Sequence, residues 1–285
     1  MIDVDEIRKK ITAKVIADSI SPEGKRLTTM QVTFHRFILA EVNTHRMLTR
    51  SSASSRAIPV QRVLDRITAT PFFAISWPVE QRGMQGGAEL VGSDLLAAQD
   101  VLEDIAQYTL ERIQAYVEHV PPESRLHKSV LNRPLEWFSD HTALITATEW
   151  DNFFALRCNR LAQPEFRVVA ELMEEALEQS VPERVQFGAW HTPYVDWAAK
   201  EELLDAGLDP KAVSVGRCCR VSYLTQEGKR DPWEDVNLCD RLLHPEEGPP
   251  HASPFEHVAT PAREGENVLG NFHGWHQYRH LVTDF

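Results

Sequence analysis

The stretch MQVTFHRFILAEV, residues 30–42, is the segment on which the fold of this chain depends. Its first half is rich in β-branched and aromatic side chains, including Val32 and Phe34, and this composition predicts a β-strand. The alternation of apolar and polar residues is not kept as far as Ile38 and Leu39. A helix is therefore the alternative prediction for the end of the segment. The sequence therefore predicts a sheet that contains this segment, with a change of backbone conformation close to residue 40.

A second strand is predicted upstream, at residues 13–16, and the turn-forming sequence Ser21-Pro22-Glu23-Gly24 joins the two. Helical spacing of apolar residues predicts a long helix from Ser93 or Asp94 to about Val120, ended by Pro121-Pro122. Another helix is predicted from about Pro164 to Pro182. The fold class expected is α+β, a single domain over residues 1–285 that combines helices with an antiparallel sheet.

Residues 57–93 are rich in proline and glycine and predict an irregular excursion, either a lid or a plain surface loop. The 285 residues are 42% hydrophobic, which suffices for a well-buried core. No long apolar run suggests a signal peptide or a membrane span, so a cytoplasmic protein is expected. The formal charge of −12 disfavours binding to a nucleic-acid polymer. Four cysteines without a CxxC pair indicate reduced thiols and no cysteine-type zinc site.

Two polar clusters can carry chemistry. The first runs from His45 to Arg56 and combines three arginines with four serines, groups that bind phosphate oxygens. The alternative for this cluster is a polar loop whose serines cap backbone amides. The second runs from Lys128 to Arg167 and offers amides and guanidinium groups suited to a heterocycle. Its alternative is a solvated helix face with ion pairs to Glu165 and Glu171.

These residues resemble the flavin-dependent thymidylate synthases. Thr44-His45-Arg46, seven residues and Ser54 are similar to the family signature Arg-His-Arg, seven residues and Ser. Residues 152–157 (NFFALR) and 162–167 (AQPEFR) resemble a later family segment, Asn-Phe-Leu-x-Leu-Arg followed by Ala-Gln-x-Glu-Ile. Three further elements agree with the family pattern: residues 128–131 (KSVL), 220–223 (RVSY) and 251–257 (HASPFEH).

The order of these elements differs from that of the family. The RVSY and HASPFEH elements come last here, whereas in the family their counterparts precede the Arg-His-Arg element. Since the cyclic order is consistent, the chain resembles a circularly permuted member of the family, which is permissible when the termini lie at the surface.

The resemblance implies a homotetramer that binds FAD and transfers a methylene group from methylenetetrahydrofolate to carbon 5 of dUMP, with NADPH as reductant. It implies FAD contacts for His45, Arg46, Asn152, Ser253 and Glu256. It implies nucleotide contacts for Ser54, Ser55, Arg56, Lys128 and Arg157. Arg157 would stabilise the ionised pyrimidine, and His251 would lie near flavin and folate, so these two are the candidate catalytic residues.

Departures from the family pattern leave the substrate open. Thr44 and Ser52 replace an arginine and a glutamate of the signature. Glu41 replaces a glutamine close to the nucleotide, and a carboxylate, which only accepts hydrogen bonds, favours an amino-bearing pyrimidine such as that of dCMP. The alternative is that Glu41 pairs with Arg46 or Arg50. Another interpretation is a protein that binds flavin or nucleotide without catalysing a reaction.

The C-terminal segment has no counterpart in the family pattern. Its His273, His276 and His280 have spacings that suit one helical face, which raises the alternative of a metal-dependent hydrolase. The other interpretation is an aromatic terminal helix that packs on the core or at a subunit interface, and the site expected here holds no metal.

Overall fold

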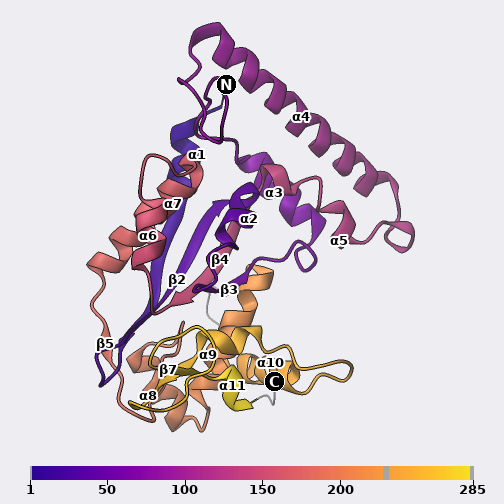
Figure 1. Cartoon of the computed structure of the whole chain (residues 1–285). Helices are drawn as coiled ribbons and strands as arrows, with labels where there is room; N and C mark the ends of the chain where they lie inside the picture. Colours follow the sequence, from indigo (N-terminus) through magenta and orange to yellow (C-terminus); the bar gives the residue numbers. More distant parts are fainter. Residues whose placement is uncertain (1, 227–230, 283–285) are drawn as a thin grey trace.

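A computed structural model describes residues 2–226 and 231–282 of the chain (Figure 1). Five described strands form a sheet in the order β3-β4-β2-β1-β5. The strands are β1 (Thr12–Ile20), β2 (Arg26–His35), β3 (Thr49–Ser52), β4 (Asp140–Ala147) and β5 (Glu183–Arg184). Every pairing is antiparallel except that of β1 with β5. The mixed helix and antiparallel-sheet class expected from the sequence is confirmed.

The β1–β2 hairpin forms around the predicted turn. The Ser21 amide donates to the Lys25 carbonyl at 2.9 Å, and Gly24 adopts a φ of 74°, which suits glycine. β1 extends beyond the predicted residues 13–16. β2 ends at His35, and residues 36–42 are helical, as a 3₁₀ turn (Arg36–Ile38) and α2 (Leu39–Val42). The helical interpretation of the end of this segment is therefore correct.

One face of the sheet is covered by α7 (Pro164–Gln179), which places an apolar stripe against β2. Phe166 and Met173 pack in the same buried cluster as Met30 and Val32. Proline occupies the first turn of α7, as predicted, and the helix ends three residues before Pro182. Burial of these side chains anchors α7 on the sheet.

The long helix α4 (Gly92–His119) runs along the edge of the molecule, away from the sheet (Figure 1). The prediction that Ser93 or Asp94 caps it is wrong by two or three residues. Its N-cap is Val91, and both polar residues lie inside the first turn. Helix ends are weakly determined by local sequence, so a shift of this size is expected.

The prediction that residues 57–93 are irregular is half wrong, because they contain α3 (Val60–Ala69). Leu64 and Ile67 of this helix are buried in the main core, and this packing stabilises the helix. Pro59 precedes the helix and Pro71 follows it, so neither proline interrupts it. Residues 70–91 contain no helix and only an isolated bridge between Pro78 and Glu89.

The chain from residue 185 onward forms a C-terminal layer over the other face of the sheet, drawn in orange and yellow in Figure 1. Leu144 of β4 packs there with Cys218 and Val221, and Leu27 of β2 packs with Trp275. The main elements of the layer are α8 (Trp197–Asp205), α9 (Pro210–Arg220), α10 (Pro232–Leu243), β6 (Ala259–Pro261) and β7 (Trp275–Gln277). β4 is thus buried on both faces, whereas Thr12 and Lys14 of β1 and both residues of β5 are exposed.

Short elements complete the described chain: α1 (Val4–Lys10), α5 (Lys128–Leu131), α6 (Asp151–Arg157), α11 (Arg279–Val282) and the 3₁₀ turns Pro122–Ser124, Glu136–Phe138, Val221–Tyr223 and Ser253–His257. The four cysteines are unpaired, as expected. Across residues 2–226 and 231–282, none of the helices has the length and apolar character needed to cross a membrane.

Candidate active site

The structure brings His45 and Arg157 into direct contact. His45 lies in the turn after α2, and Arg157 is the last residue of α6. The Nε of Arg157 donates a hydrogen bond to Nε2 of His45 at 2.8 Å. The Arg157 guanidinium also lies over the Phe166 ring, 4.5 Å from its centroid. A candidate flavin residue and a candidate nucleotide residue, 112 positions apart, thus form one unit.

The electrostatics of this pair fix the state of His45. Burial, and then the charges of Arg157 and Arg50, lower the pKa of His45 to about 4. The imidazole is therefore neutral at pH 7, and because Nε2 accepts a hydrogen bond its proton is on Nδ1. Within the described residues, no hydrogen bond engages the two terminal nitrogens of Arg157. Arg157 thus presents a two-nitrogen fork next to a neutral imidazole donor.

Arg50 of β3 connects this pair to the C-terminal motif. One guanidinium nitrogen of Arg50 donates to the His45 carbonyl at 2.6 Å. Burial lowers the pKa of Arg50, and the nearby Glu256 carboxylate opposes that shift. Glu256 itself is ion-paired with Arg279. The candidate flavin residues His45 and Glu256, from opposite ends of the sequence, are therefore linked through Arg50.

Further contacts hold the C-terminal layer against the same turn. The amide nitrogen of Asn271 donates to the carbonyls of Arg46 and Met47 at 3.3 and 3.1 Å, and its oxygen accepts from Thr49 at 3.0 Å. His257 bonds Ser51 of β3 at 2.9 Å. The first and last motifs of the chain are thus neighbours in space.

Three of the candidate nucleotide residues, Ser54, Ser55 and Arg56, lie on one loop after β3, and Lys128 contacts that loop from α5. The Ser54 amide donates to the carbonyl of Ser222, which belongs to the RVSY element, at 3.0 Å. Lys128 donates from Nζ to the Ala57 carbonyl at 2.7 Å, and this single contact leaves two of its three ammonium hydrogens available. The structure therefore gathers Ser54, Ser55, Arg56 and Lys128 around one loop, and it brings the RVSY element to them.

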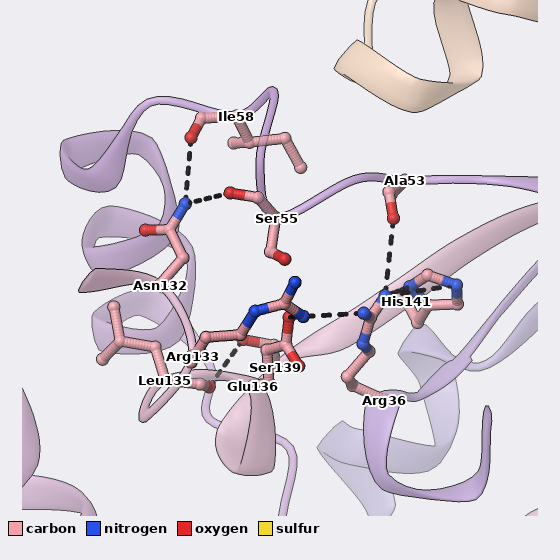
Figure 2. Close-up of polar contacts among 10 residues, drawn as sticks. All are labelled: Arg36, Ala53, Ser55, Ile58, Asn132, Arg133, Leu135, Glu136, Ser139 and His141. Atoms are coloured by element: carbon pink, nitrogen blue, oxygen red, sulfur yellow. Dashed lines mark hydrogen bonds and ion pairs between the residues drawn. The ribbon is translucent and has the colours of Figure 1, made fainter. Parts of the chain in front are cut away.

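A small pocket lies beneath this loop, and Figure 2 shows the polar contacts among residues that line or surround it. The side-chain amide of Asn132 holds the loop above the pocket by donating to the carbonyls of Ser55 and Ile58 at 2.7 and 3.0 Å. On the floor, Arg36 donates to Nδ1 of His141 at 2.6 Å and pairs with Glu136 at 3.3 Å. The free volume is about 40 Å³, room for a few water molecules but not for a nucleotide.

His141, on the floor of the pocket, is neutral at pH 7. Burial, then the charges of Arg36 and Arg66, lower the pKa of His141 to about 3. Glu136 also pairs with Arg133 at 2.9 Å. Neither Arg36 nor His141 was predicted, because neither stands in a motif and their contact depends on the neighbouring ends of β2 and β4.

Several candidate residues are placed at the surface without side-chain contacts among the described residues. They are Arg46, Arg56, Asn152, His251 and Ser253. Glu41 differs from them, because its Oε2 is buried and has no hydrogen-bond partner in the described part of the chain. The predicted alternative of an ion pair between Glu41 and Arg46 or Arg50 does not form there.

The ion pairs proposed as the alternative for the second cluster form in part. Arg167 approaches Glu171 at 3.5 Å, on the surface of α7. Glu165 is buried instead and accepts from the Ile75 amide at 2.9 Å. The second cluster is thus partly a solvated helix face and partly a core contact.

The C-terminal histidines do not share a helical face. Trp275–Gln277 is the strand β7, and Trp275 is fully buried, so the expected terminal helix is wrong over these residues. His273 pairs with Glu149 at 3.0 Å and His276 with Glu266 at 2.9 Å. Within the described residues, no group of three or more histidine, cysteine, aspartate or glutamate side chains is arranged to hold a metal ion.

Two solved structures of known proteins are similar to this chain. The chain is similar to the UMP/dUMP methylase PolB from Streptomyces cacaoi, with 14% identity and a TM-score of 0.46 over 59% of this chain and 90% of that one. It is also similar to the flavin-dependent thymidylate synthase ThyX from Helicobacter pylori, with 14% identity and a TM-score of 0.35 over 53% of this chain and 67% of that one. No curated protein sequence matches the chain.

The family model described as thymidylate synthase complementing protein matches residues 23–183, more than half of the chain. This range runs from the β1–β2 turn to the start of β5 and contains His45, the Ser54 loop, Lys128 and Arg157. The chain therefore belongs to the family of thymidylate synthase complementing proteins, the flavin-dependent thymidylate synthases.

Proposed function

We propose that this protein converts dUMP to dTMP by transferring a one-carbon unit from methylenetetrahydrofolate to carbon 5 of the pyrimidine, with NADPH as reductant. The observation that carries the proposal is the contact between His45 and Arg157 at 2.8 Å. It places the terminal nitrogens of Arg157 beside the group expected to meet the flavin. A substrate held by Arg157 is then held next to the cofactor, as transfer between them requires.

FAD is the cofactor of the family, and NADPH and methylenetetrahydrofolate are its co-substrates. The residues of this chain fit FAD, because neutral His45 offers an Nδ1–H donor and Arg46, Asn152 and Ser253 are exposed. Glu256 would complete this set through its position beside Arg50. When bound at these residues, FAD would supply, in its reduced form, the hydride that the one-carbon unit requires.

The nucleotide would lie across the loop after β3. Ser54, Ser55, Arg56 and Lys128 offer hydroxyl, guanidinium and ammonium donors for its phosphate. Arg157 would bind the pyrimidine and stabilise negative charge that develops on it, and its role is electrostatic. Because Arg157 is already held by His45 and Phe166, little reorganisation is needed when this charge forms. His251 would lie near flavin and folate.

A second substrate is favoured by one observation, the buried and unpaired Oε2 of Glu41. A buried carboxylate oxygen without a donor costs free energy that a ligand amino group can recover. dCMP presents such an amino group and dUMP does not. The same chemistry on dCMP is therefore the second candidate for this site.

The whole chain, residues 1–285, would act as one permuted catalytic domain. The supporting contacts join the motifs at the two ends of the sequence: His257 meets Ser51 at 2.9 Å, and Asn271 holds the turn of Arg46. We further propose that the protein works in the cytoplasm as a homotetramer, with no nucleic-acid polymer or membrane as partner.

The proposal is tested with purified full-length protein in two steps. Titration with FAD should give a bound flavin spectrum, and absence of any binding refutes the proposal. Turnover with methylenetetrahydrofolate and NADPH is then compared for dUMP and dCMP, in the natural protein and in Glu41→Gln. Turnover of dUMP alone, unchanged in Glu41→Gln, removes the dCMP candidate. Preference for dCMP that Glu41→Gln shifts toward dUMP establishes it.

FAD binding without turnover of either nucleotide would support the interpretation of a protein that binds flavin or nucleotide without catalysis. The alternative of a metal-dependent hydrolase is tested separately by metal analysis of the same protein. Stoichiometric metal together with failure to bind FAD would support that alternative. In the structure, His273 and His276 each contact one glutamate, Glu149 and Glu266 respectively.

A further inference from the structure

A row of hydrogen-bonded side chains crosses the sheet beneath the C-terminal layer. It begins at Ser51 of β3 and ends at Ser19 of β1. The contacts, in order, are Ser51 to His257 at 2.9 Å, His257 to Thr146 at 2.8 Å, Thr146 to Thr29 at 2.7 Å, Thr29 to His191 at 2.8 Å, and His191 to Ser19 at 2.8 Å. Each of the six residues is at most 9% exposed. Water therefore has little access to any of these bonds.

Both imidazoles in the row are neutral at pH 7, because burial lowers the pKa of His257 and of His191 to about 3. A neutral imidazole has one N–H donor and one lone pair, and a hydroxyl has one hydrogen to donate. Each of the four inner groups has contacts on two sides, one to each neighbour in the row. If it donates to one neighbour it must accept from the other.

A threonine hydroxyl that accepted from both neighbours would leave its own hydrogen buried without an acceptor, which costs free energy. The row therefore has two favourable orders, in which every inner group donates once and accepts once. In the first, hydrogen donation runs from Ser19 toward Ser51, both histidines carry their proton on Nε2, and the hydroxyl hydrogen of Ser51 is left over. In the second, donation runs from Ser51 toward Ser19, both histidines carry their proton on Nδ1, and Ser51 has no hydrogen left to donate. Ser51 follows Arg50 in the strand that supports His45.

We propose that this row is a hydrogen-bond relay in which His257 and His191 are positioning residues that set the hydroxyl of Ser51 as a donor to an oxygen of bound FAD. Binding of that acceptor selects the first order and fixes all six groups at once. The relay itself stands on the contacts of the chain, and only the identity of the ligand rests on the proposed function.

The relay makes opposite predictions for changes at its two ends. Ser51→Ala leaves Nε2 of His257 without a partner, and a buried lone pair without a donor costs less than a buried N–H without an acceptor. Both histidines should then become Nδ1–H tautomers. Ser19→Ala leaves Nδ1 of His191 without a partner, so both histidines should become Nε2–H tautomers.

The measurement is ¹H–¹⁵N correlation NMR of the imidazole rings in the full chain labelled at histidine, which separates the two tautomers. Loss of each signal in His257→Gln and His191→Gln assigns the spectra. Ser214→Ala is the matched control, because Ser214 is buried and bonded to the Pro193 carbonyl at 2.8 Å but lies outside the row. It should change neither tautomer.

Thr146→Val, nearly equal in shape, cuts the row at its centre. In that background Ser19→Ala should affect His191 and leave His257 unchanged. If instead each serine variant changes only the histidine next to it in the otherwise natural chain, the groups are a set of separate structural bonds and the relay is refuted. Circular dichroism of each variant verifies that the fold is kept.

The ligand is tested by adding FAD to the same samples. FAD should bring both histidines of the natural protein to the Nε2–H form, and Ser51→Ala should weaken FAD binding roughly fivefold, the effect of about one hydrogen bond. Ser19→Ala should bind FAD no more weakly than the natural protein. Equal affinity in Ser51→Ala refutes the contact to FAD. Failure of the natural protein to bind FAD refutes the proposed function but leaves the tautomer result as the test of the relay.

Discussion

Arg157 reaches His45 through its Nε, at 2.8 Å, and this contact leaves the two terminal nitrogens of the guanidinium for another partner. Arg157→Ala should leave FAD bound but reduce turnover roughly 10²- to 10³-fold, the loss typical of one electrostatic donor. Turnover of Arg157→Lys should lie between that of the natural protein and that of Arg157→Ala. An ammonium group cannot bond His45 and also present two further nitrogens to the substrate. Steady-state kinetics and the flavin spectrum measure both effects. Arg160→Ala, at an exposed position nearby, should behave like the natural protein, and unchanged turnover in Arg157→Ala would contradict the assigned role.

The same contact also controls the protonation of His45. Burial is the largest cause of its pKa of about 4, and Arg157 is the second. Arg157→Ala should therefore raise the pKa of His45 only part of the way toward 6.5. Titration of the ¹⁵N-labelled imidazole measures this shift, and a pKa that stays at its natural value would show that the charge of Arg157 has no influence.

Stability should fall in acid because of the buried histidines. His191 and His257 have a pKa of about 3 in the folded chain, against about 6.5 when unfolded. Between these values the unfolded chain binds more protons, so the free energy of unfolding decreases as the pH falls from about 6.5 toward 3, by up to about 1.4 kcal/mol per pH unit for each histidine. Urea unfolding at several pH values gives the slope. It should become less steep in His191→Gln, and an unchanged slope would contradict the assignment.

Asp235 carries the buried charge that holds α9 to α10. Its carboxylate is fully buried and accepts from Arg220 at 2.5 Å and Arg217 at 3.3 Å. The helices approach so closely there that a Cβ on Gly216 would lie 2.4 Å from the Asp235 carbonyl oxygen. Asp235→Asn should lower the free energy of unfolding by about 3–5 kcal/mol, because it removes the negative partner of two arginines. Asp240→Asn, exposed on the same helix, should change it by about 0.5 kcal/mol or less in the same denaturation experiment.

Asn271 should support the flavin site from the C-terminal layer. Asn271→Asp keeps an oxygen for Thr49 but replaces the two hydrogen bonds to Arg46 and Met47 with repulsion between oxygens. The turn that carries His45 should loosen, and FAD affinity should fall roughly tenfold. Fluorescence titration of FAD measures this change. Asn237→Asp, exposed on α10, should leave FAD affinity unchanged. Equal FAD affinity of the two variants would show that Asn271 does not support the flavin site.

Local patterns in the sequence predicted the elements whose cause is local. The β1–β2 turn, the start of α7 and the helical end of residues 36–42 follow from turn residues, an N-terminal proline and broken alternation. Residues 60–69 were missed, because their prolines flank the helix and its stability depends on Leu64 and Ile67 packing in the core. The C-terminal histidines were misplaced, because their spacing alone cannot distinguish β7 from a helix.

For the candidate site, residue types predicted two polar clusters suited to an anion and a heterocycle, and the family resemblance implied roles for His45, the Ser54 loop, Arg157 and Glu256. The contacts that orient them were not predicted. Arg36 with His141, and His191 with Thr29, join strands and loops more than a hundred residues apart, and neither partner is marked by a neighbour in the sequence.

The sequence by itself thus determined the family and the set of groups proposed to bind flavin and nucleotide, because side-chain chemistry and spacing along the chain are properties of the sequence. Only the tertiary structure decided which groups meet. It placed the last motif on the first through His257 and Ser51, set His45 as a neutral imidazole held by Arg157, and left one oxygen of Glu41 buried without a partner among the described residues. Protonation and hydrogen-bond direction depend on burial and on neighbours brought together by folding, and no local pattern records either.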